Sequence, residues 1–480
     1  MHPKLIKILT VAAIAGHPIA GLAEDEKTVE YPGSVYPVEY LNAHLEEPIV
    51  VSSLKADVSD VAVENDDPAP ANGETVKDAI ETALSFNPQI EISKSQVDAA
   101  AADQFAAFGQ FLPDVEVTAA HTDDSWRSSS LQTLQDRDGT TFGVTAVQPI
   151  SQGLATFNRY RSARSRLNQA DFSFLSVRQQ VAFNAARAHA NVVLAREIVD
   201  HRVSNLALLN RQFEIVSKRA KAGAQGRTGV EQARVRRAQA QVDLGTARAS
   251  LAQSEAAYHR ITGRETPVQF QADESDRDRS TSTLDGSIQL ARDANPDVNA
   301  SEEALKAAEF AKGAALGDFA PKVTLEGSYF RRFGADQTLT QEDDEYQLVA
   351  RLRVPIFNQG RNIADLRNAR ASTRQARAEL NSTRLAIDEV VTRSWRQLAQ
   401  AENKRVAAKQ GIEAAKQSVK GLQLEYEAGQ RTVIDVLDGQ RDLVQALISL
   451  SQSEFDVRVS RYELFAATGS IFDAFEILSD

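Results

Sequence analysis

The chain has 480 residues, no cysteine and a formal net charge of −12. The absence of cysteine excludes a disulfide framework, thiolate metal sites, a cysteine nucleophile and a lipid attached to an N-terminal cysteine. No run of about 18 apolar residues occurs, which excludes a polytopic helical membrane protein, and the acidic balance argues against a nucleic-acid-binding protein.

The first residues have the pattern of a secretory signal peptide. Lys4 and Lys7 form a positive region, residues 8–14 are apolar, and Gly21-Leu22-Ala23 resembles a small-residue cleavage site. We therefore expect residues 1–23 to be a signal peptide. An N-terminal amphipathic or core helix is the alternative, and it fits less well because polar sequence follows at once.

Residues 24–74 are strongly acidic, with thirteen Asp or Glu, two Lys and five prolines. High charge with scattered prolines favours an extended or disordered segment. A partner-binding arm is the alternative function for this segment.

The rest of the chain contains an internal repeat. The landmarks Asn87-Pro88, Phe111-Leu112-Pro113, Gln148-Pro149-Ile150 and Ala222-Gly223 recur as Asn295-Pro296, Phe319-Ala320-Pro321, Val354-Pro355-Ile356 and Ala428-Gly429, at offsets of 208, 208, 206 and 206. This order predicts two tandem structural repeats, residues 75–262 and 287–468. Residues 263–286 would link them, and residues 469–480 would form a C-terminal tail.

Each repeat contains two runs in which apolar and polar residues alternate. These runs are residues 115–120 and 142–147 in the first repeat and 323–330 and 346–354 in the second. Period-2 alternation predicts strands with one apolar face, and polar loops are expected at Arg127–Gly139 and Gly334–Asp344. Strands of about 10 residues can cross a bilayer when tilted, although an ordinary half-buried hairpin has the same pattern.

Two long proline-free stretches follow the strand pairs, at residues 154–222 and 362–428. Each predicts a helix of roughly 100 Å at 1.5 Å per residue. A shorter return helix starts near Thr432. Helices of this length require an elongated bundle, and small or apolar residues at coiled-coil spacing support one. Four strands cannot close a barrel, and open edges are not tolerated in lipid, so spanning strands would require oligomerisation.

This layout resembles the TolC family of outer membrane channels over nearly the whole chain after residue 75. The paired prolines Pro113/Pro321 and Pro149/Pro355 and the segment Tyr426–Asp438 carry the resemblance. It implies a mixed α and β membrane protein: a homotrimer whose 12-stranded β-barrel lies in outer membrane lipid and continues into a long periplasmic α-helical coiled-coil tunnel. The four prolines would mark the barrel-tunnel junctions.

The resemblance also places a periplasmic constriction at Asp435 and Asp438. These carboxylates are three residues apart and share a helix face, and six of them in a trimer would favour cations. Asp435 could instead complete a capping box with Thr432, as Glu231 could with Thr228. Asp438 lies beyond the cap and is the better constriction candidate.

A tip latch is the other implied site. In the family, a Tyr and an Arg on one hairpin link to a Thr-Asp pair on the other. Tyr426, Arg431 and Thr228 match three of these positions, and Gly229 stands where the family has its acid. Arg431 could alternatively be a cation at the C-terminal end of a helix dipole.

No other chemistry is indicated. The seven histidines show no metal-ligand spacing, and His189, His201 and His259 are expected on the bundle surface. No nucleotide-binding or hydrolase motif occurs. We therefore expect no enzyme activity, no metal, no cofactor and no nucleic-acid partner.

The sequence thus predicts an outer membrane channel of a tripartite export system. Its partners would be a periplasmic adaptor (membrane fusion protein) and an inner-membrane transporter of the ABC or RND type. The ending Tyr462–Gly469 resembles members used in type I protein secretion, and the absence of cysteine argues against the lipid-anchored efflux branch. A multidrug efflux pump is the alternative, and a non-pore periplasmic coiled-coil scaffold is a second, although a scaffold leaves the four strand runs unexplained.

Overall fold

A computed structural model describes residues 73–127, 134–223, 226–270, 283–336, 339–340 and 343–477. The predicted signal peptide and the acidic segment up to residue 72 lie outside these residues. The contacts group residues 68–480 into one compact unit. No helix among the described residues combines the length and apolarity that crossing a bilayer requires.

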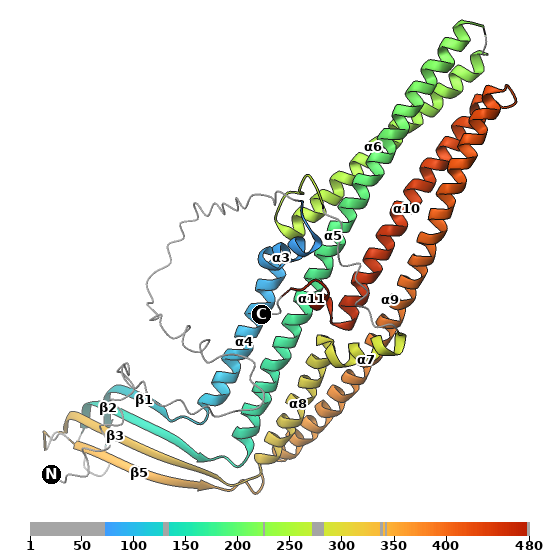
Figure 1. The fold of residues 1–480 in the computed structure, drawn as a ribbon. Coiled ribbons are helices and arrows are strands. Elements are labelled where there is room, and N and C mark those ends of the chain that lie inside the picture. The colour runs from blue at the N-terminus through green and yellow to red at the C-terminus, as the bar shows by residue number, and fades with distance from the viewer. Residues whose placement is uncertain are drawn as a thin grey trace, which may run out of the picture. The chain divides into compact units, whose positions relative to one another are not determined.

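The structure repeats its elements in the same order twice (Figure 1). The first repeat contains α3 (Val76–Phe86), α4 (Pro88–Gly109), β1 (Asp114–Arg127), β2 (Leu134–Ser151), α5 (Ala155–Lys221) and α6 (Arg227–Thr262). The second contains α7 (Leu284–Ala294), α8 (Pro296–Gly317), β3 (Lys322–Asp336), β4 (Leu339–Thr340), β5 (Asp343–Arg353), α9 (Arg361–Glu427) and α10 (Val433–Thr468), and α11 (Ile471–Ala474) follows.

Equivalent helices of the two repeats have identical lengths. The four pairs have 11, 22, 67 and 36 residues. At 1.5 Å per residue, α5 and α9 are each about 100 Å long. The predicted long helices and the predicted tandem repeat are confirmed.

The two Asn-Pro landmarks begin α4 and α8. Asn87 and Asn295 are N-caps whose side-chain oxygens accept bonds from Gln89 N and Asp297 N at 3.0 and 2.9 Å, and a proline occupies the first helical position. The Asn295 amide also donates to Ala467 O at 3.0 Å. Asn87 Nδ2 makes the equivalent bond to Ile261 O of α6 at 3.4 Å. Each landmark therefore starts one helix and ties that start to the end of a return helix.

A glycine ends each return helix in the left-handed conformation. Gly263 caps α6 with φ of 73°, and Gly469 caps α10 with φ of 80°. A Cβ on Gly469 would lie 2.7 Å from Ala294 O. Glycine is required here both for the backbone angle and for the close approach of the neighbouring helix end.

The strands form one antiparallel sheet in the order β1-β2-β3-β5, and β4 pairs with the outer end of β3. The register places apolar residues of all four long strands in the same rows. Val117, Val144, Tyr329 and Tyr346 form one such row, and Val115, Ala146, Gly327 and Leu348 form the next. Val117, Tyr346 and Leu348 are 74%, 70% and 71% exposed, so the sheet presents an uncovered apolar face.

The opposite face of the sheet is polar and carries ion pairs. Arg351 bonds Glu326 at 3.3 Å, and Arg332 bonds Glu345 at 2.9 Å. A sheet with one exposed apolar face and one charged face is the pattern of strands that separate lipid from an aqueous interior.

The strands are longer than the sequence predicted. They have 14, 18, 15 and 11 residues rather than about 10. The predicted polar loops were therefore too long, because residues 134–139, 334–336 and 343–344 belong to strands. The polar residues beyond the apolar rows still pair with the adjacent strands, since backbone hydrogen bonds do not depend on the side chain.

The prolines lie where strands meet helices. Pro113 and Pro321 immediately precede β1 and β3, and Pro355 follows β5 by two residues. Pro149 is inside β2, next to a register shift that falls between Pro149 and Ser151. Proline lacks an N–H, so it fits these strand ends and irregularities.

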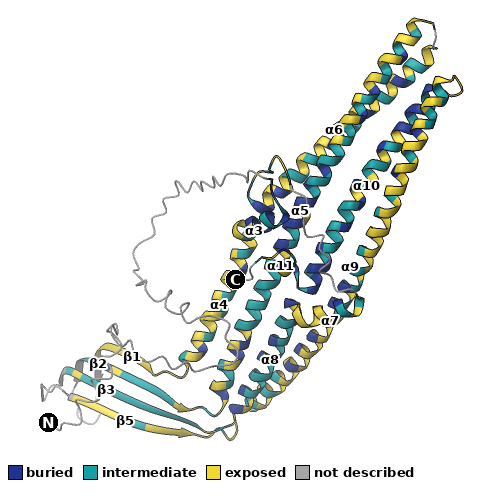
Figure 2. Ribbon diagram, in the orientation of Figure 1, coloured by how far each residue is buried: buried dark blue, intermediate teal, exposed yellow. Residues whose placement is uncertain are grey.

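Small apolar residues pack the helices together, and Figure 2 shows buried positions along the helices. Ala182, Ala185 and Ala186 on α5 are fully buried and join a cluster with Ile80 of α3 and Ile471 next to α10. Alanine allows the helix axes to approach closely. On α9 the predicted seam is buried at Ala376, Leu380, Ile387, Val391, Ile412 and Val419.

Some residues are more buried than predicted. Glu74, counted with the acidic segment, is 6% exposed, and its N–H donates to Gln269 O at 3.1 Å. His189 is 3% exposed and stacks edge-on against Phe270 at 4.5 Å, so the surface position expected for it is wrong. The chain just after α6 folds back over α5 and covers this histidine.

A buried hydrogen bond fixes Glu74 to α6. The fully buried Tyr258 hydroxyl donates to Glu74 Oε1 at 2.6 Å. Desolvation raises the pKa of Glu74, and the bond from Tyr258 opposes that rise. The hydrogen bond therefore stabilises the ionised form of Glu74 more than its protonated form.

We expect Tyr258→Phe to lower the free energy of unfolding by about 1–3 kcal/mol, because it leaves a buried carboxyl without its donor. A raised pKa in the folded state means that stability is lost as pH rises through that pKa. The loss in the variant should thus be larger at pH 8 than at pH 4. Thermal unfolding followed by circular dichroism at both pH values measures it. The control is Tyr346→Phe, at a 70% exposed side chain, and equal losses in the two variants would contradict the assignment.

Candidate functional site: the two helix-turn-helix tips

Each long helix pair ends in a tight turn, α5 to α6 and α9 to α10. Gly223 and Gly429 occupy these turns with φ of 77° and 75°. The two hairpins pack together near their turns through a small apolar cluster. Its buried members are Leu209, Val216, Ala233, Ala240, Val433 and Leu437, and Tyr426 packs against it.

Asp435 completes a capping box at the start of α10. Its Oδ2 accepts bonds from Thr432 N at 2.9 Å and Thr432 Oγ1 at 2.8 Å, and its own N–H donates to Thr432 Oγ1 at 3.4 Å. These bonds from the Thr432 side chain and backbone lower the pKa of Asp435. The capping alternative for Asp435 is confirmed.

The corresponding capping prediction in the first repeat is wrong. α6 begins at Arg227 with Gly226 as its N-cap, and no side chain caps it. Thr228 and Gly229 are therefore the second and third residues of the helix. The helix starts earlier because the extended backbone of Gly226, with ψ of 153°, already places the chain for the first turn.

Asp438 joins the two hairpins. Its Oδ1 accepts a bond from Arg236 Nη2 of α6 at 2.6 Å, and both side chains are 37% exposed. Asp438 lies one turn beyond Asp435, and its partner is 202 residues away in sequence. An exposed charge-assisted pair of this kind stabilises by about 0.2–1 kcal/mol.

Tyr426 makes the second contact between the hairpins. Arg219 of α5 donates to the Tyr426 hydroxyl at 2.9 Å, and its guanidinium lies 5.3 Å from the centre of the same ring. Arg431 instead bonds Glu425 of its own hairpin at 2.8 Å, a contact that raises the pKa of Arg431. Within one protomer, the structure thus pairs Tyr426 with Arg219 rather than with Thr228 or Gly229.

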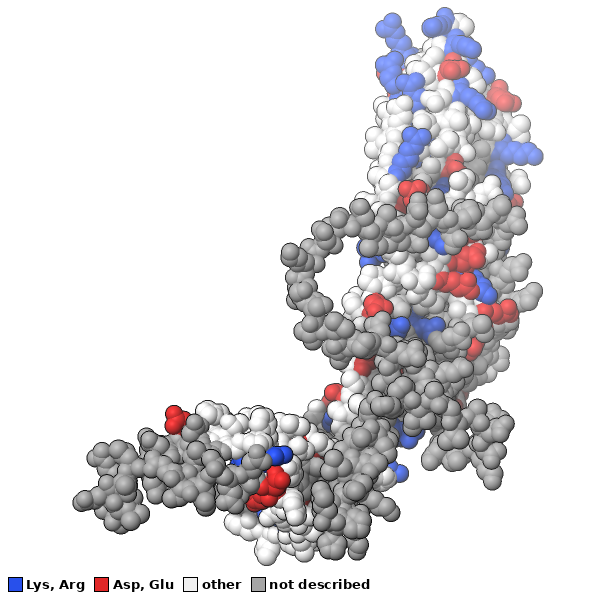
Figure 3. Space-filling view, turned by 90° about the vertical axis from the view of Figure 1, so that its left-hand side faces the viewer, with Lys and Arg blue, Asp and Glu red and all other residues white. Residues whose placement is uncertain are grey.

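The two tips differ in net charge, and the residues Tyr426–Asp438 and Thr228–Gly229 alone do not show this difference. Residues 208–238 around the first turn hold eight Lys or Arg and two Glu, whereas residues 414–444 around the second hold four bases and five acids. Figure 3 shows Lys and Arg gathered at this end of the molecule. A charge count on each tip would have predicted that bases of the first hairpin face acids of the second, as Arg236 faces Asp438.

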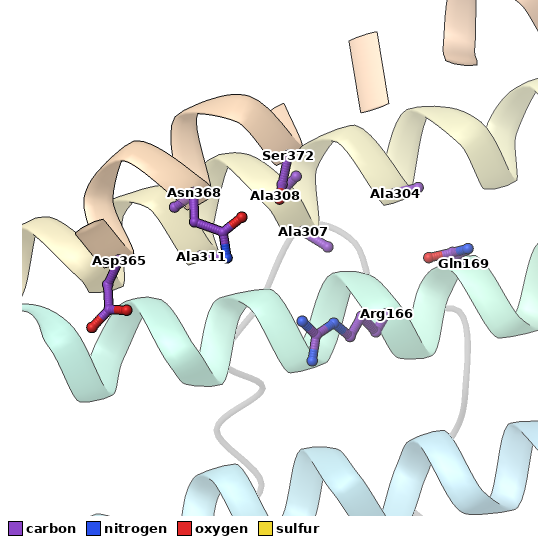
Figure 4. A pocket seen from close by; sticks show the side chains of 10 residues that line it. Arg166, Gln169, Ala304, Ala307, Ala308, Ala311, Asp365, Asn368 and Ser372 are labelled. Carbon is purple, nitrogen blue, oxygen red and sulfur yellow. The ribbon is translucent and has the colours of Figure 1, made fainter. Parts of the chain in front are cut away.

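A polar groove of about 370 Å³ lies far from the tips, between α5, α8 and α9 (Figure 4). Four alanines of α8 form its floor, and Arg166, Gln169, Asp365, Asn368 and Ser372 line its sides. Small residues on the middle helix leave the space open. The described residues contain no group of three or more metal-ligating side chains, and nothing in the groove arranges a nucleophile with a base.

Comparison with known proteins gives the family. The sequence profile described as outer membrane efflux protein matches residues 79–264 and 287–470. The chain belongs to this family, the TolC family. The two matched segments correspond to the two structural repeats.

Three relatives illustrate its range. The chain is 29% identical to the outer membrane efflux protein BepC of Brucella suis, over 68% of this chain and 72% of the relative. It is 23% identical to the outer membrane protein TolC of Vibrio cholerae, over 83% and 91% of the two chains. It is 22% identical to the alkaline protease secretion protein AprF of Pseudomonas aeruginosa, over 79% and 81%.

The fold is that of solved channels. The crystal structure of CusC superposes with a TM-score of 0.75 at 20% identity, covering 82% of this chain and 92% of that chain. The predicted fold class is confirmed. The protein is thus a non-enzymatic outer membrane channel with a periplasmic helical extension, and channels of this family form trimers that work with adaptors and inner-membrane transporters.

We expect Arg236→Glu to loosen the tip, because it places a second carboxylate against Asp438 and reverses an attraction between the hairpins. In a planar bilayer the variant should show higher mean conductance than the parent. The swap Arg236→Asp/Asp438→Arg should return conductance toward the parent value.

Arg234→Glu is the matched control for this experiment. It makes the same charge change two residues away, where Arg234 pairs with Glu231 of its own helix at 2.9 Å. Equal conductance changes for Arg234→Glu and Arg236→Glu would show that total tip charge matters, and not the pair.

Proposed function

We propose that three copies of this chain form the outer membrane channel of a type I protein secretion system. The observation that supports a membrane-spanning barrel is the apolar face that runs across all four long strands and that none of the described residues covers. Three chains would supply 12 strands, within the range of known barrels. The polar face, with its Arg351–Glu326 pair, would then line the aqueous interior, and the four prolines would mark the junctions between barrel and helices.

Asp435 and Asp438 are proposed as the periplasmic constriction. Both occur on one face of α10, three residues apart, so a trimer would hold six such carboxylates. Their contacts refine this proposal. Asp435 is engaged by its cap and Asp438 is partly neutralised by Arg236, so the field at the constriction would depend on how closely the hairpins pack.

The tips are also the proposed docking point for the periplasmic adaptor. Tyr426, Arg431, Thr228 and Gly229 remain candidates for the tip latch, and Arg219 and Arg236 join them. Contacts of Arg431 or Thr228 across a protomer boundary would be additional to the contacts within one chain.

The secretion assignment rests on two features of the sequence. The chain has no cysteine that could carry a lipid anchor, and residues 462–469 resemble members used in type I secretion. AprF, a relative over most of its length, is named for protease secretion. A second candidate is drug efflux, which the name of BepC, the relative at 29% identity, favours. The exposed apolar sheet argues against a scaffold without a pore.

The channel proposal predicts a trimer in the outer membrane fraction that conducts ions in a planar bilayer and prefers cations. Asp438→Asn should reduce the cation preference, whereas Arg236→Gln should increase it by releasing the Asp438 charge. Reversal potentials in a salt gradient measure both. Recovery of only a soluble periplasmic monomer, or no change of selectivity in either variant, would contradict the proposal.

Deletion of the gene separates the two export classes. Loss of a protein from the culture medium, without a change in the inhibitory concentration of dyes and antibiotics, is expected for type I secretion. Increased sensitivity to small toxic compounds with an unchanged set of secreted proteins would instead support drug efflux. Complementation with the parent gene should restore the lost phenotype in either case.

A further inference from the structure

The first turns of α5 and α9, where each helix leaves the sheet, are rich in arginine. Residues 155–170 contain four arginines and no acid, and residues 361–376 contain four arginines and one acid. Two of these positions recur at the offset that relates the two helices, Arg161 with Arg367 and Arg164 with Arg370. All four side chains are exposed, and none forms an ion pair with a carboxylate of the described residues. Exposed charge is usual on a helix, so a ligand needs further evidence.

That evidence is the setting of Arg161, which lies between two aromatic rings. Its guanidinium carbon is 4.8 Å from the centre of the Phe157 ring and 5.1 Å from that of Phe310 on α8. Ring contacts orient a guanidinium and leave the N–H donors at its edge. No hydrogen bond among the described residues uses these donors. In contrast, Arg196 lies 4.7 Å from the Phe270 ring and also donates to a backbone oxygen at 3.1 Å.

Arg161 faces away from the polar groove between α5, α8 and α9. Arg166 lines that groove (Figure 4), and five residues of helix place Arg161 about 140° around α5 from it. The side of Arg161 also carries Leu175 and Ala182, two and three heptads further along, which belong to the cluster with residues of α3 and α11. Because a conducting tunnel needs its inner side free, the side that α3 and α11 cover is the outer side.

Exposed apolar side chains lead along the chain from the sheet to Arg161. Ile150 near the end of β2, Leu154 before α5 and Phe157 in its first turn are 60%, 68% and 45% exposed. The order apolar, aromatic, cationic matches the order of acyl chain, interface and phosphate in a lipid leaflet. Since the helices extend into the periplasm, the leaflet at this level is the periplasmic one.

We propose that Arg161, with Arg164 about one turn further along, binds the phosphate of an anionic phospholipid in the periplasmic leaflet. The guanidinium N–H groups of Arg161 donate to the phosphate oxygens. Arg164 supplies a second positive charge, and the acyl chains lie against Leu154 and Phe157. Two neighbouring bases favour a lipid with net negative charge over a zwitterionic one. The inference rests on the proposed membrane-spanning sheet and is independent of the export class.

Native mass spectrometry of the purified protein tests this site. Dioleoylphosphatidylglycerol is the anionic probe, and dioleoylphosphatidylcholine has the same acyl chains without net charge. The parent should bind one molecule of the anionic lipid per chain more tightly than it binds the zwitterionic lipid. Arg161→Gln should weaken that binding about tenfold, the size expected for loss of a charged hydrogen-bond partner. Arg166→Gln is the matched control, because it removes the same charge on the groove side, and it should change the binding little.

Two further measurements separate the ring contacts from the charge. Phe157→Leu keeps the charge of Arg161 and removes one ring, so it should also weaken binding of the anionic lipid, by less than Arg161→Gln does. A ligand that binds only the folded assembly stabilises it. Phosphatidylglycerol should therefore raise the temperature at which the parent oligomer dissociates on a gel, and this rise should be lost in Arg161→Gln.

The outcomes separate this inference from the proposed function. Equal binding of the two lipids, or equal losses in Arg161→Gln and Arg166→Gln, overturns the site. Displacement of phosphatidylglycerol by excess inorganic phosphate shows that the cluster takes free phosphate, and it overturns the lipid. A conducting outer membrane channel without lipid preference contradicts this inference alone, whereas a parent protein that forms no membrane oligomer contradicts the proposed function itself.

Discussion

A backbone N–H or C=O group that faces lipid needs a hydrogen-bond partner within the protein, because the bilayer core supplies none. In this chain the four long strands satisfy each other, but β1 and β5 have one unpaired side each. The sheet also exposes large apolar side chains such as Leu348 and Val117. In water a single copy would leave its apolar face exposed, and in lipid it would leave the edge groups of β1 and β5 without partners. Closure by further copies within a membrane resolves both problems at once.

The helices follow from the same repeat but obey a different constraint. Helices of 67 residues cannot bury themselves in a compact core, so they pack side by side, and alanine on the inward faces lets them approach. The Asn-Pro landmarks supply the N-caps of α4 and α8, and the glycines supply the left-handed ends of α6 and α10. Because these caps recur at equal positions, the two repeats keep the same helix lengths, and the strands between them keep the same register.

The tips combine apolar packing with exposed polar contacts. Val216, Val433 and Leu437 hold the hairpins together, and Arg236–Asp438 and Arg219–Tyr426 join them outside this cluster. Exposed charge pairs contribute little each, whereas apolar burial contributes more. Such an arrangement lets hairpins stay paired while remaining sensitive to a docked partner or to a change of charge. The opposite charges of the tips supply a general attraction that the specific pairs then orient.

Local residue patterns were enough to predict the tandem repeat, the two long helices, the apolar face of each strand and the Thr432–Asp435 cap. It did not determine where strands stop, since polar residues beyond the apolar rows pair through the backbone as well as apolar ones do. Thr228 does not cap α6, because the helix begins at Arg227 with Gly226 as its N-cap. The burial of His189 and the pairing of Asp438 with Arg236 were decided only by the tertiary structure, because they join segments that lie far apart in the chain. Their partners are chosen by how the hairpins and the segment after α6 pack, and no local pattern of residues encodes that packing.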